Sequence, residues 1–230
     1  MKPDRLVLFD IDGTLLSSGT VARDVFARAL EEVFGTAGDV AGYRFEGKLD
    51  PIIVTELMVE AGIAEDLIEA RRRAALDRYL DLLEEALKAT RPALKPGVDA
   101  LIESVATDAR AVNALLTGNV ARGAKLKLEA AALWHRFRFG VFGDEAPTRV
   151  HLGPMAIARA REVTGHLYEG HECVVVGDAP ADVACGKALG ARVVAVATGR
   201  TSFETLTSLG ADVVLRDFAD LASAREAIFG

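Results

Sequence analysis

Cysteines are scarce in this sequence, aromatic residues are few, and no apolar run is long. The 230 residues include two cysteines, Cys173 and Cys185, which excludes a disulfide framework and a thiolate metal site. No stretch reaches the roughly 18 consecutive apolar residues that a transmembrane helix needs. The short apolar run near the N-terminus is interrupted by two aspartates, so we expect no signal peptide and a soluble, cytoplasmic protein.

Basic residues are also outnumbered by acidic ones. Lys and Arg total 27 against 34 Asp and Glu, which gives a net charge of −7. Nucleic acid and anionic membranes are therefore unsuitable general partners, because both require a positively charged surface. Half of the residues are hydrophobic and the mean hydropathy is +0.22, so the chain buries a sizeable core and intrinsic disorder is excluded.

Short apolar runs alternate with longer helical patterns along most of the chain. This alternation predicts an α/β fold, a Rossmann-like parallel sheet with helices on both faces. The expected strands are Arg5–Phe9, Ala111–Leu116, Cys173–Val176, Ala191–Ala197 and Ala211–Leu215. The expected helices between them are Val120–Leu133, Pro154–Val163, Pro180–Leu189 and Ser202–Leu209.

Between the first two strands, residues 20–92 contain helical patterns and no strand-like run. A block of this length exceeds a simple crossover, so it predicts an inserted all-helical cap domain. The expected boundaries are residues 1–17 and 93–230 for the core and 18–92 for the cap. One cap helix is expected to start at Asp50 and Pro51, with the aspartate as N-cap.

Two predicted strands end in paired aspartates. Asp10 and Asp12 follow the first strand, and Asp178 follows the third, with Asp182 in the first turn of the next helix. Ligands of an open parallel sheet bind beyond these carboxyl ends. One aspartate could be a nucleophile for a phosphoryl group and the other a general acid/base. Carboxylates without cysteine or clustered histidine suit Mg²⁺.

The strand ending at Leu116 leads into Thr117, Gly118 and Asn119. A hydroxyl and a glycine amide at a helix start form an anion site, although a capping turn explains the same residues.

Together, Asp10-Ile11-Asp12-Gly13-Thr14, Thr117-Gly118-Asn119 and Gly177-Asp178 with Asp182 resemble the motifs of the haloacid-dehalogenase-like hydrolase superfamily. Gly47-Lys48-Leu49-Asp50-Pro51 in the insertion resembles the cap of its phosphoglycolate-phosphatase-like branch.

The resemblance implies roles for these residues. Asp10 would be the nucleophile that forms an aspartyl-phosphate, and Asp12 the general acid/base. Thr117 would hold the transferring phosphoryl group with the amide of Gly118. Asp10, the backbone carbonyl of Asp12, Asp178 and Asp182 would bind Mg²⁺. Further residues expected to contact substrate are Gly13, Thr14, Asn119 and Lys48.

The superfamily also needs a basic residue before the helix that precedes its last motif. The usual lysine-proline pair is absent, and Arg149 is our candidate because related sequences of this branch carry Asp-Arg there. Lys127 is the reserve, although its position on the 120–133 helix favours a solvated side chain. His151 is a third option.

The resemblance implies a Mg²⁺-dependent phosphatase, a phosphoric monoester hydrolase acting on a small phosphorylated metabolite, as a monomer or homodimer. Asp12 argues against a haloacid dehalogenase, and nothing around Lys48 resembles a phosphonatase motif. Two alternatives stay open: a sugar-phosphate mutase of the same fold, and a non-enzymatic phospho-aspartate receiver module. The receiver would have no use for an insertion of this size.

Overall fold

The computed structural model describes residues 4–230 and contains one six-stranded sheet of parallel strands. Its strand order is β5-β4-β1-β6-β7-β8, and every neighbouring pair is parallel. The strands are β1 (Arg5–Phe9), β4 (Ala111–Leu116), β5 (Gly140–Val141), β6 (Cys173–Gly177), β7 (Arg192–Val196) and β8 (Val213–Leu215). The predicted α/β fold with a parallel sheet is therefore confirmed.

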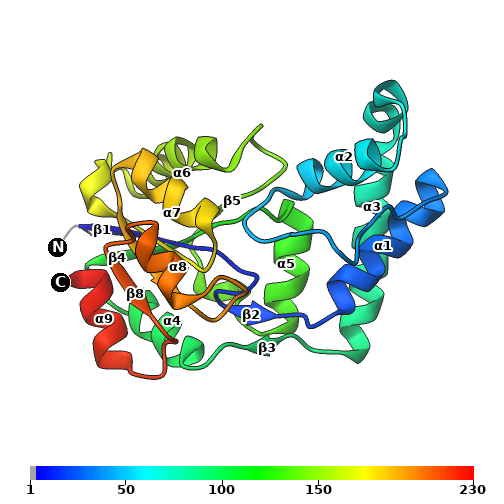
Figure 1. The fold of residues 1–230 in the computed structure, drawn as a ribbon. Coiled ribbons are helices and arrows are strands. Elements are labelled where there is room, and N and C mark those ends of the chain that lie inside the picture. Colours follow the sequence, from blue (N-terminus) through cyan, green and yellow to red (C-terminus); the bar gives the residue numbers. More distant parts are fainter. Residues whose placement is uncertain (1–3) are drawn as a thin grey trace.

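Helices cover both faces of the sheet (Figure 1). Alternate strand residues such as Val7 and Phe9 pack against α4 (Val98–Ala106), α5 (Ala121–Ala130) and α9 (Leu221–Phe229). The intervening residues, such as Leu6 and Leu8, pack against the opposite layer, which contains α6 (Arg149–Thr164) and α7 (Pro180–Leu189). The short helix α8 (Phe203–Ser208) packs near β7 and β8. Because both faces are covered, the strands read as continuous apolar runs.

Helix boundaries differ from the sequence prediction in one place that matters for function. We expected a helix to begin at Pro154, but α6 begins at Arg149 and contains that proline. A proline removes one backbone hydrogen bond, here to the carbonyl of Val150, four residues earlier. Val150 is 42% exposed, so this turn of the helix lies at the surface. The helix is thus long enough to carry Arg149 on its first turn.

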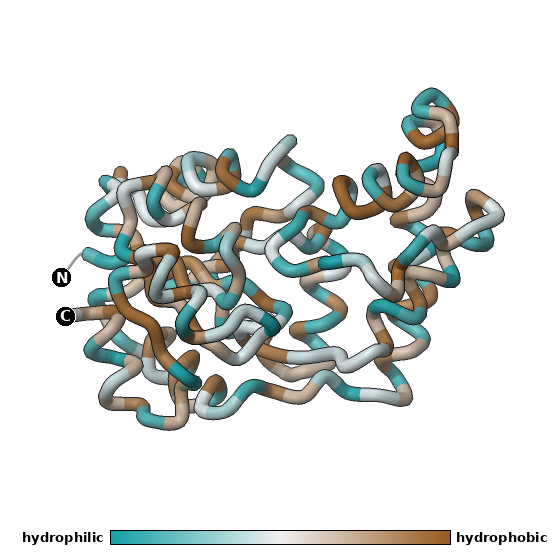
Figure 2. The backbone as a smooth tube through the Cα atoms, in the orientation of Figure 1, coloured by the Kyte–Doolittle hydropathy of each residue, from teal (hydrophilic) through white to brown (hydrophobic). Residues whose placement is uncertain are grey.

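The insertion consists of α1 (Val21–Phe34), α2 (Asp50–Glu60) and α3 (Glu65–Ala89), which lie beside the sheet (Figure 1). Hydrophobic and hydrophilic residues alternate along these helices (Figure 2). A two-stranded antiparallel ribbon of β2 (Leu16–Ser17) and β3 (Ala93–Leu94) joins the insertion to the core. No strand is found among residues 18–92, all of which the structure describes. The domain boundaries themselves stay a prediction.

Helix α5 belongs to the core by its chain position but also contacts the insertion. Val120, which precedes the helix, is buried in the apolar cluster of α1–α3, and Leu126 and Ala130 pack against that cluster. Arg122 forms ion pairs with Asp81 and Glu84 of α3, at 2.8 and 2.7 Å. The opposite side of α5 contributes Ala124 and Leu128 to the core beneath the sheet. The helix therefore lies between the sheet and the insertion (Figure 1).

Within residues 4–230, no helix combines the length and the hydrophobicity needed to cross a membrane.

Candidate active site

Three neighbouring strands, β4, β1 and β6, end at one cavity of about 310 Å³. Asp10 follows β1, Thr117 follows β4 and Asp178 follows β6, and each is at least 95% buried. Parallel strands place their carboxyl ends on the same edge of a sheet, so segments far apart in sequence converge there. The insertion closes the cavity on the side opposite the sheet, because residues of α1, α2 and α3 line it.

Asp10, Asp178 and Asp182 form a buried carboxylate cluster. One oxygen from each lies within 4.8 Å of the others. Burial raises the pKa of Asp178 well above its usual range, and repulsion from Asp10 and Asp182 raises it further. Burial also raises the pKa of Asp182, although Arg149 opposes the shift. Three oxygen donors in such a cluster fit a divalent cation of the Mg²⁺ class, which would offset the repulsion.

The loop after β1 is shaped around Asp178. Thr14 Oγ1 donates a hydrogen bond to Asp178 Oδ1 at 2.9 Å. Gly13 has φ +87°, and a Cβ there would lie 2.4 Å from Asp178 Oδ2. A Cβ on Gly199 would lie closer still, 1.7 Å from the same oxygen. The Asp178 carboxylate thus occupies a site that only glycine backbone can approach.

Arg149 joins the two aspartate-bearing strand ends. Its Nη2 lies 2.8 Å from Asp10 Oδ1 and also contacts Asp182 Oδ1. Burial alone would lower the pKa of Arg149, but Asp182 and Asp10 outweigh burial and raise the pKa. Its Nε is buried without a hydrogen-bond partner. The structure thus places our first candidate for the basic residue beside the proposed nucleophile.

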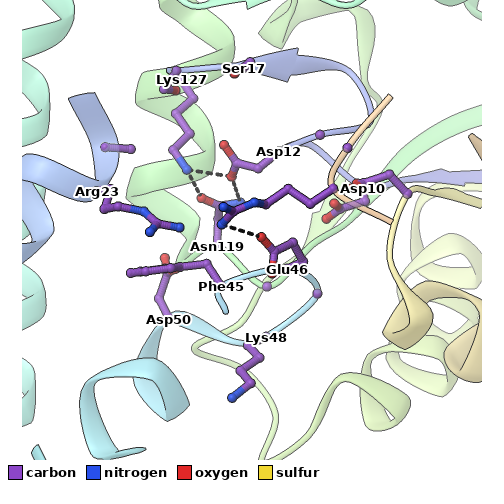
Figure 3. A pocket seen from close by; sticks show the side chains of 18 of the residues that line it. Asp10, Asp12, Ser17, Arg23, Phe45, Glu46, Lys48, Asp50, Asn119 and Lys127 are labelled. Carbon is purple, nitrogen blue, oxygen red and sulfur yellow. Dashed lines mark hydrogen bonds and ion pairs between the residues drawn. The ribbon is translucent and has the colours of Figure 1, made fainter. Parts of the chain in front are cut away.

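Lys127 is buried too, which corrects the expectation of a solvated side chain. Its Nζ lies 2.6 Å from Asp12 Oδ2 and donates to Asn119 Oδ1 at 2.6 Å. Asn119 Nδ2 donates to the same Asp12 oxygen at 2.8 Å and to Thr117 Oγ1 at 2.9 Å. Figure 3 shows the contacts among Lys127, Asp12 and Asn119 beside the cavity. The two basic candidates therefore hold different aspartates. His151, the third candidate, bonds Thr148 Oγ1 through Nδ1 and does not line the cavity.

The loop after β4 is in close contact with the insertion. The amide of Asp50 donates to the carbonyl of Gly118 at 2.9 Å. A Cβ on Gly118 would lie 2.0 Å from the carbonyl oxygen of Lys48. The approach is possible because residue 118 has no side chain, so the predicted phosphate loop and the insertion meet at this glycine.

Comparison with known proteins identifies the family. A model of haloacid dehalogenase-like hydrolases matches residues 5–190. The chain belongs to this family. It is 30% identical to a phosphoglycolate phosphatase of Rhodospirillum rubrum over 234 residues, which covers 94% of this chain and 89% of the relative.

Solved structures agree on the fold. A hydrolase from Pseudomonas syringae superposes with a TM-score of 0.73 at 20% identity, covering 98% of this chain and 99% of that one. CbbY from Rhodobacter sphaeroides, in complex with phosphate, gives 0.68 at 20% identity, with coverages of 94% and 96%. The resemblance to the haloacid-dehalogenase-like superfamily, in its phosphoglycolate-phosphatase-like branch, is confirmed, as is the expectation of a hydrolase.

The side chains of two residues in this hydrolase's insertion make contacts that differ from those expected from the sequence. Asp50 does not cap its own helix: Leu49 is the N-cap, and Asp50 Oδ2 accepts a hydrogen bond from the amide of Val120 at 2.9 Å. A tertiary contact to α5 has replaced the local capping bond. Lys48 lines the cavity, but its amine contacts Glu56 and Tyr43 and is directed away from Asp10 and Asp12 (Figure 3).

Several cavity residues gave no signal in the sequence. Arg23 of α1 donates to the carbonyls of Val40 and Ala41, at 3.3 and 3.0 Å, and its guanidinium lies 4.8 Å from the ring centroid of Phe45. Within residues 4–230 it has no carboxylate partner. Lys95 Nζ donates to the carbonyl of Thr198 at 2.6 Å on the core side. Isolated basic residues on helices and loops are common, so only the fold shows that these two line the cavity.

Proposed function

We propose that this hydrolase is a Mg²⁺-dependent phosphatase that cleaves a small phosphorylated metabolite through an aspartyl-phosphate on Asp10. The observation that carries the proposal is the placement of Asp10 beside Asp178, Asp182 and the Arg149 guanidinium at one end of the sheet. A carboxylate with a fixed cation beside it can face an anionic phosphoryl group without prohibitive repulsion.

In the first step, an oxygen of Asp10 attacks phosphorus and the bond from phosphorus to the leaving oxygen breaks. Asp12, whose side chain is 42% exposed toward the cavity, gives a proton to that leaving oxygen. In the second step, water attacks the phosphorus of the aspartyl-phosphate. Asp12 takes a proton from the water, and the bond to Asp10 breaks. Phosphate leaves and both aspartates return to their starting states.

The phosphoryl oxygens would be bound by the loop after β4. Thr117 Oγ1 accepts two hydrogen bonds from Asn119, and in the proposal its own hydroxyl hydrogen donates to a phosphoryl oxygen. The amides of Gly118 and Thr14 are further donors in the proposal, whereas the amide of Gly13 already donates to the carbonyl of Leu16 at 2.9 Å. Asn119 contributes through its hydrogen bonds to Asp12 and Thr117. Donors fixed before substrate binds stabilise developing charge effectively.

Asp10, Asp178 and Asp182, with the backbone carbonyl of Asp12, would hold the Mg²⁺. When bound, the ion supplies positive charge that offsets the charge of the phosphoryl group and of the carboxylates. Support comes from the buried cluster and the raised pKa values of Asp178 and Asp182, which indicate carboxylates in need of a cation.

For the substrate, the named relatives suggest where to begin. Three relatives are phosphoglycolate phosphatases, from Rhodospirillum rubrum, Mesorhizobium japonicum and Vibrio cholerae. Phosphoglycolate is therefore the first compound to test in our proposal. Arg23, which has no carboxylate partner among residues 4–230, lines the cavity and is suited to a substrate with a second negative group.

A screen of phosphorylated metabolites, with release of inorganic phosphate as the readout, tests the proposal. We expect at least one good substrate and complete loss of phosphate release in Asp10→Asn, which keeps the shape of the side chain. Phosphate release by a folded D10N variant would overturn the nucleophile assignment. Conversion of a sugar phosphate without phosphate release would identify the mutase alternative instead. The family match already favours a hydrolase over a receiver module.

A further inference from the structure

Lys127 is an ammonium group in the interior, outside the aspartate cluster. It lies on α5, and its side chain is 5% exposed. One turn earlier on the helix, Gly123 and Ala124 are also buried. A lysine at such a position is costly unless its charge is matched by well-placed partners.

Lys127 and Asn119 both donate hydrogen bonds to the same oxygen of Asp12. Lys127 Nζ and Asn119 Nδ2 both bind Asp12 Oδ2, at 2.6 and 2.8 Å. Lys127 also binds Asn119 Oδ1, so the three side chains form a closed triangle of hydrogen bonds. Within residues 4–230 no hydrogen bond is made by the other oxygen, Asp12 Oδ1. One oxygen of Asp12 is thus fixed and the other is free.

Residues of the insertion also lie close to the Lys127 ammonium. Asp50 of α2 and Tyr79 of α3 both lie near its ammonium. Burial alone would lower the pKa of this group, but Asp12, Tyr79 and Asp50 together outweigh burial. The pKa of Lys127 is therefore raised. No second ammonium or guanidinium contacts Asp12 in the described chain, because Arg149 pairs with Asp10 and Asp182.

We propose that Lys127 is a positioning residue: together with Asn119 it fixes Asp12 Oδ2, so that Asp12 Oδ1 is presented to the leaving oxygen and later to the attacking water. The inference rests on the proposed function, in which Asp12 transfers these protons. Lys127 itself touches no reacting atom, so its loss should affect the proton transfers and not the attack on phosphorus.

This role predicts a dependence on the leaving group. A nitrophenolate leaves from phosphorus without help from an acid, whereas an alkoxide needs the proton of Asp12. Both substrates share the second step, in which Asp12 must take a proton from water. A misplaced Asp12 therefore slows the first step with an alkyl phosphate but not with p-nitrophenyl phosphate. It slows the second step, release of phosphate from Asp10, with both substrates.

The experiment is rapid-quench kinetics of K127M with p-nitrophenyl phosphate and with the best alkyl phosphate from the screen. With the aryl ester we expect a burst of one equivalent of nitrophenolate, at a rate within about threefold of wild type. With the alkyl ester we expect the first turnover to fall by about 100-fold, the lower end of what a general acid contributes. The control is K125M, which removes an exposed lysine of the same helix and should match wild type.

Equal losses with both substrates, or no loss with either, would overturn the proposal. Mass spectrometry during turnover adds a readout that a structural role would not move: K127M should accumulate phosphorylated Asp10. D12N should show the same leaving-group dependence, and adding K127M to D12N should cost little more. If K127M does not fold, K127Q, whose polar side chain is one atom shorter than lysine and carries no charge, should give the same result. Absence of Asp10-dependent turnover in wild type would contradict the proposed function instead.

Discussion

Arg149 Nη2 lies 2.8 Å from Asp10 Oδ1, and the two side chains are 6% and 7% exposed. The same nitrogen contacts Asp182, so one guanidinium neutralises a carboxylate that follows β1 and another in the first turn of α7. Planar geometry and several fixed donors allow arginine to do this, whereas a lysine ammonium is a single point of charge.

Removing this guanidinium should therefore cost both activity and stability. Arg149→Ala leaves two buried carboxylates without their cation, and we expect the free energy of unfolding to fall by about 3–5 kcal/mol. Arg149→Lys should lose less stability but should not bridge both aspartates. Urea denaturation checks the change. Arg200→Ala, which removes a 67%-exposed partner of Glu46, is the control and should cost at most about 1 kcal/mol. A stable R149A would show that the pair contributes little.

Divalent cations should be required for phosphate release. Chelation by EDTA should abolish turnover and added Mg²⁺ should restore it, because the buried carboxylates of Asp10, Asp178 and Asp182 repel one another. Mg²⁺ should also raise the melting temperature of wild type but not of Asp178→Asn. Full activity in EDTA, or an equal shift in melting temperature for both proteins, would contradict the ligand assignment.

Asp50 should make the protein less stable as the pH rises. Burial raises the pKa of this carboxyl to about 6, above the value of about 3.9 in an unfolded chain. Between these values the folded state binds the extra proton, so the free energy of unfolding decreases as pH increases through the window. The loss approaches about 3 kcal/mol at about 1.4 kcal/mol per pKa unit.

The measurement is urea denaturation of wild type and Asp50→Asn at several pH values between 4 and 7. The raised pKa values of Asp178 and Asp182 also lower the free energy of unfolding as pH rises, but they do so equally in wild type and in Asp50→Asn. The difference between the two stability-against-pH curves therefore reports Asp50. Parallel curves would mean that Asp50 is not the source.

Arg23 should select substrates that carry a second negative group. Its guanidinium lines the cavity and donates to two backbone carbonyls, and no carboxylate in the described part of the chain pairs with it, so its charge remains for a ligand. Arg23→Gln should raise KM for phosphoglycolate about tenfold or more, as expected for a charge-assisted hydrogen bond. The KM for p-nitrophenyl phosphate should change less than about twofold. Arg28→Gln, on the exposed face of the same helix and paired with Glu32, is the matched control. Equal effects on both substrates would rule out this selectivity.

The aspartate cluster was predictable because it follows from topology. Asp10 and Asp178 each end a continuous apolar run, and the carboxyl ends of buried parallel strands meet at one edge. Nothing beyond the order of strands and helices was needed for this step. Likewise, the length without strand-like runs between β1 and β4 was enough to indicate an insertion.

Lys127 and Asp50 were misplaced because local rules compete with tertiary contacts. A lysine on a helix is usually solvated, yet Lys127 repeats the spacing of Gly123 and Ala124, small residues of the buried face. That spacing was the available signal. Asp50 before a proline fits a capping rule, but its carboxylate instead binds the amide of Val120, a partner seventy residues away. Such partners cannot be read from a window of neighbouring residues.

Helix α5 sets a limit on how this enzyme could be simplified. One side of the helix packs under the sheet. The other side, with Leu126 and Ala130, packs against the apolar cluster of α1–α3, as does Val120 just before the helix. Excising residues 18–92 to obtain a minimal enzyme would expose that second side to water, together with Lys127. A truncated chain of this kind should aggregate during expression unless the outer face of α5 is redesigned with polar residues.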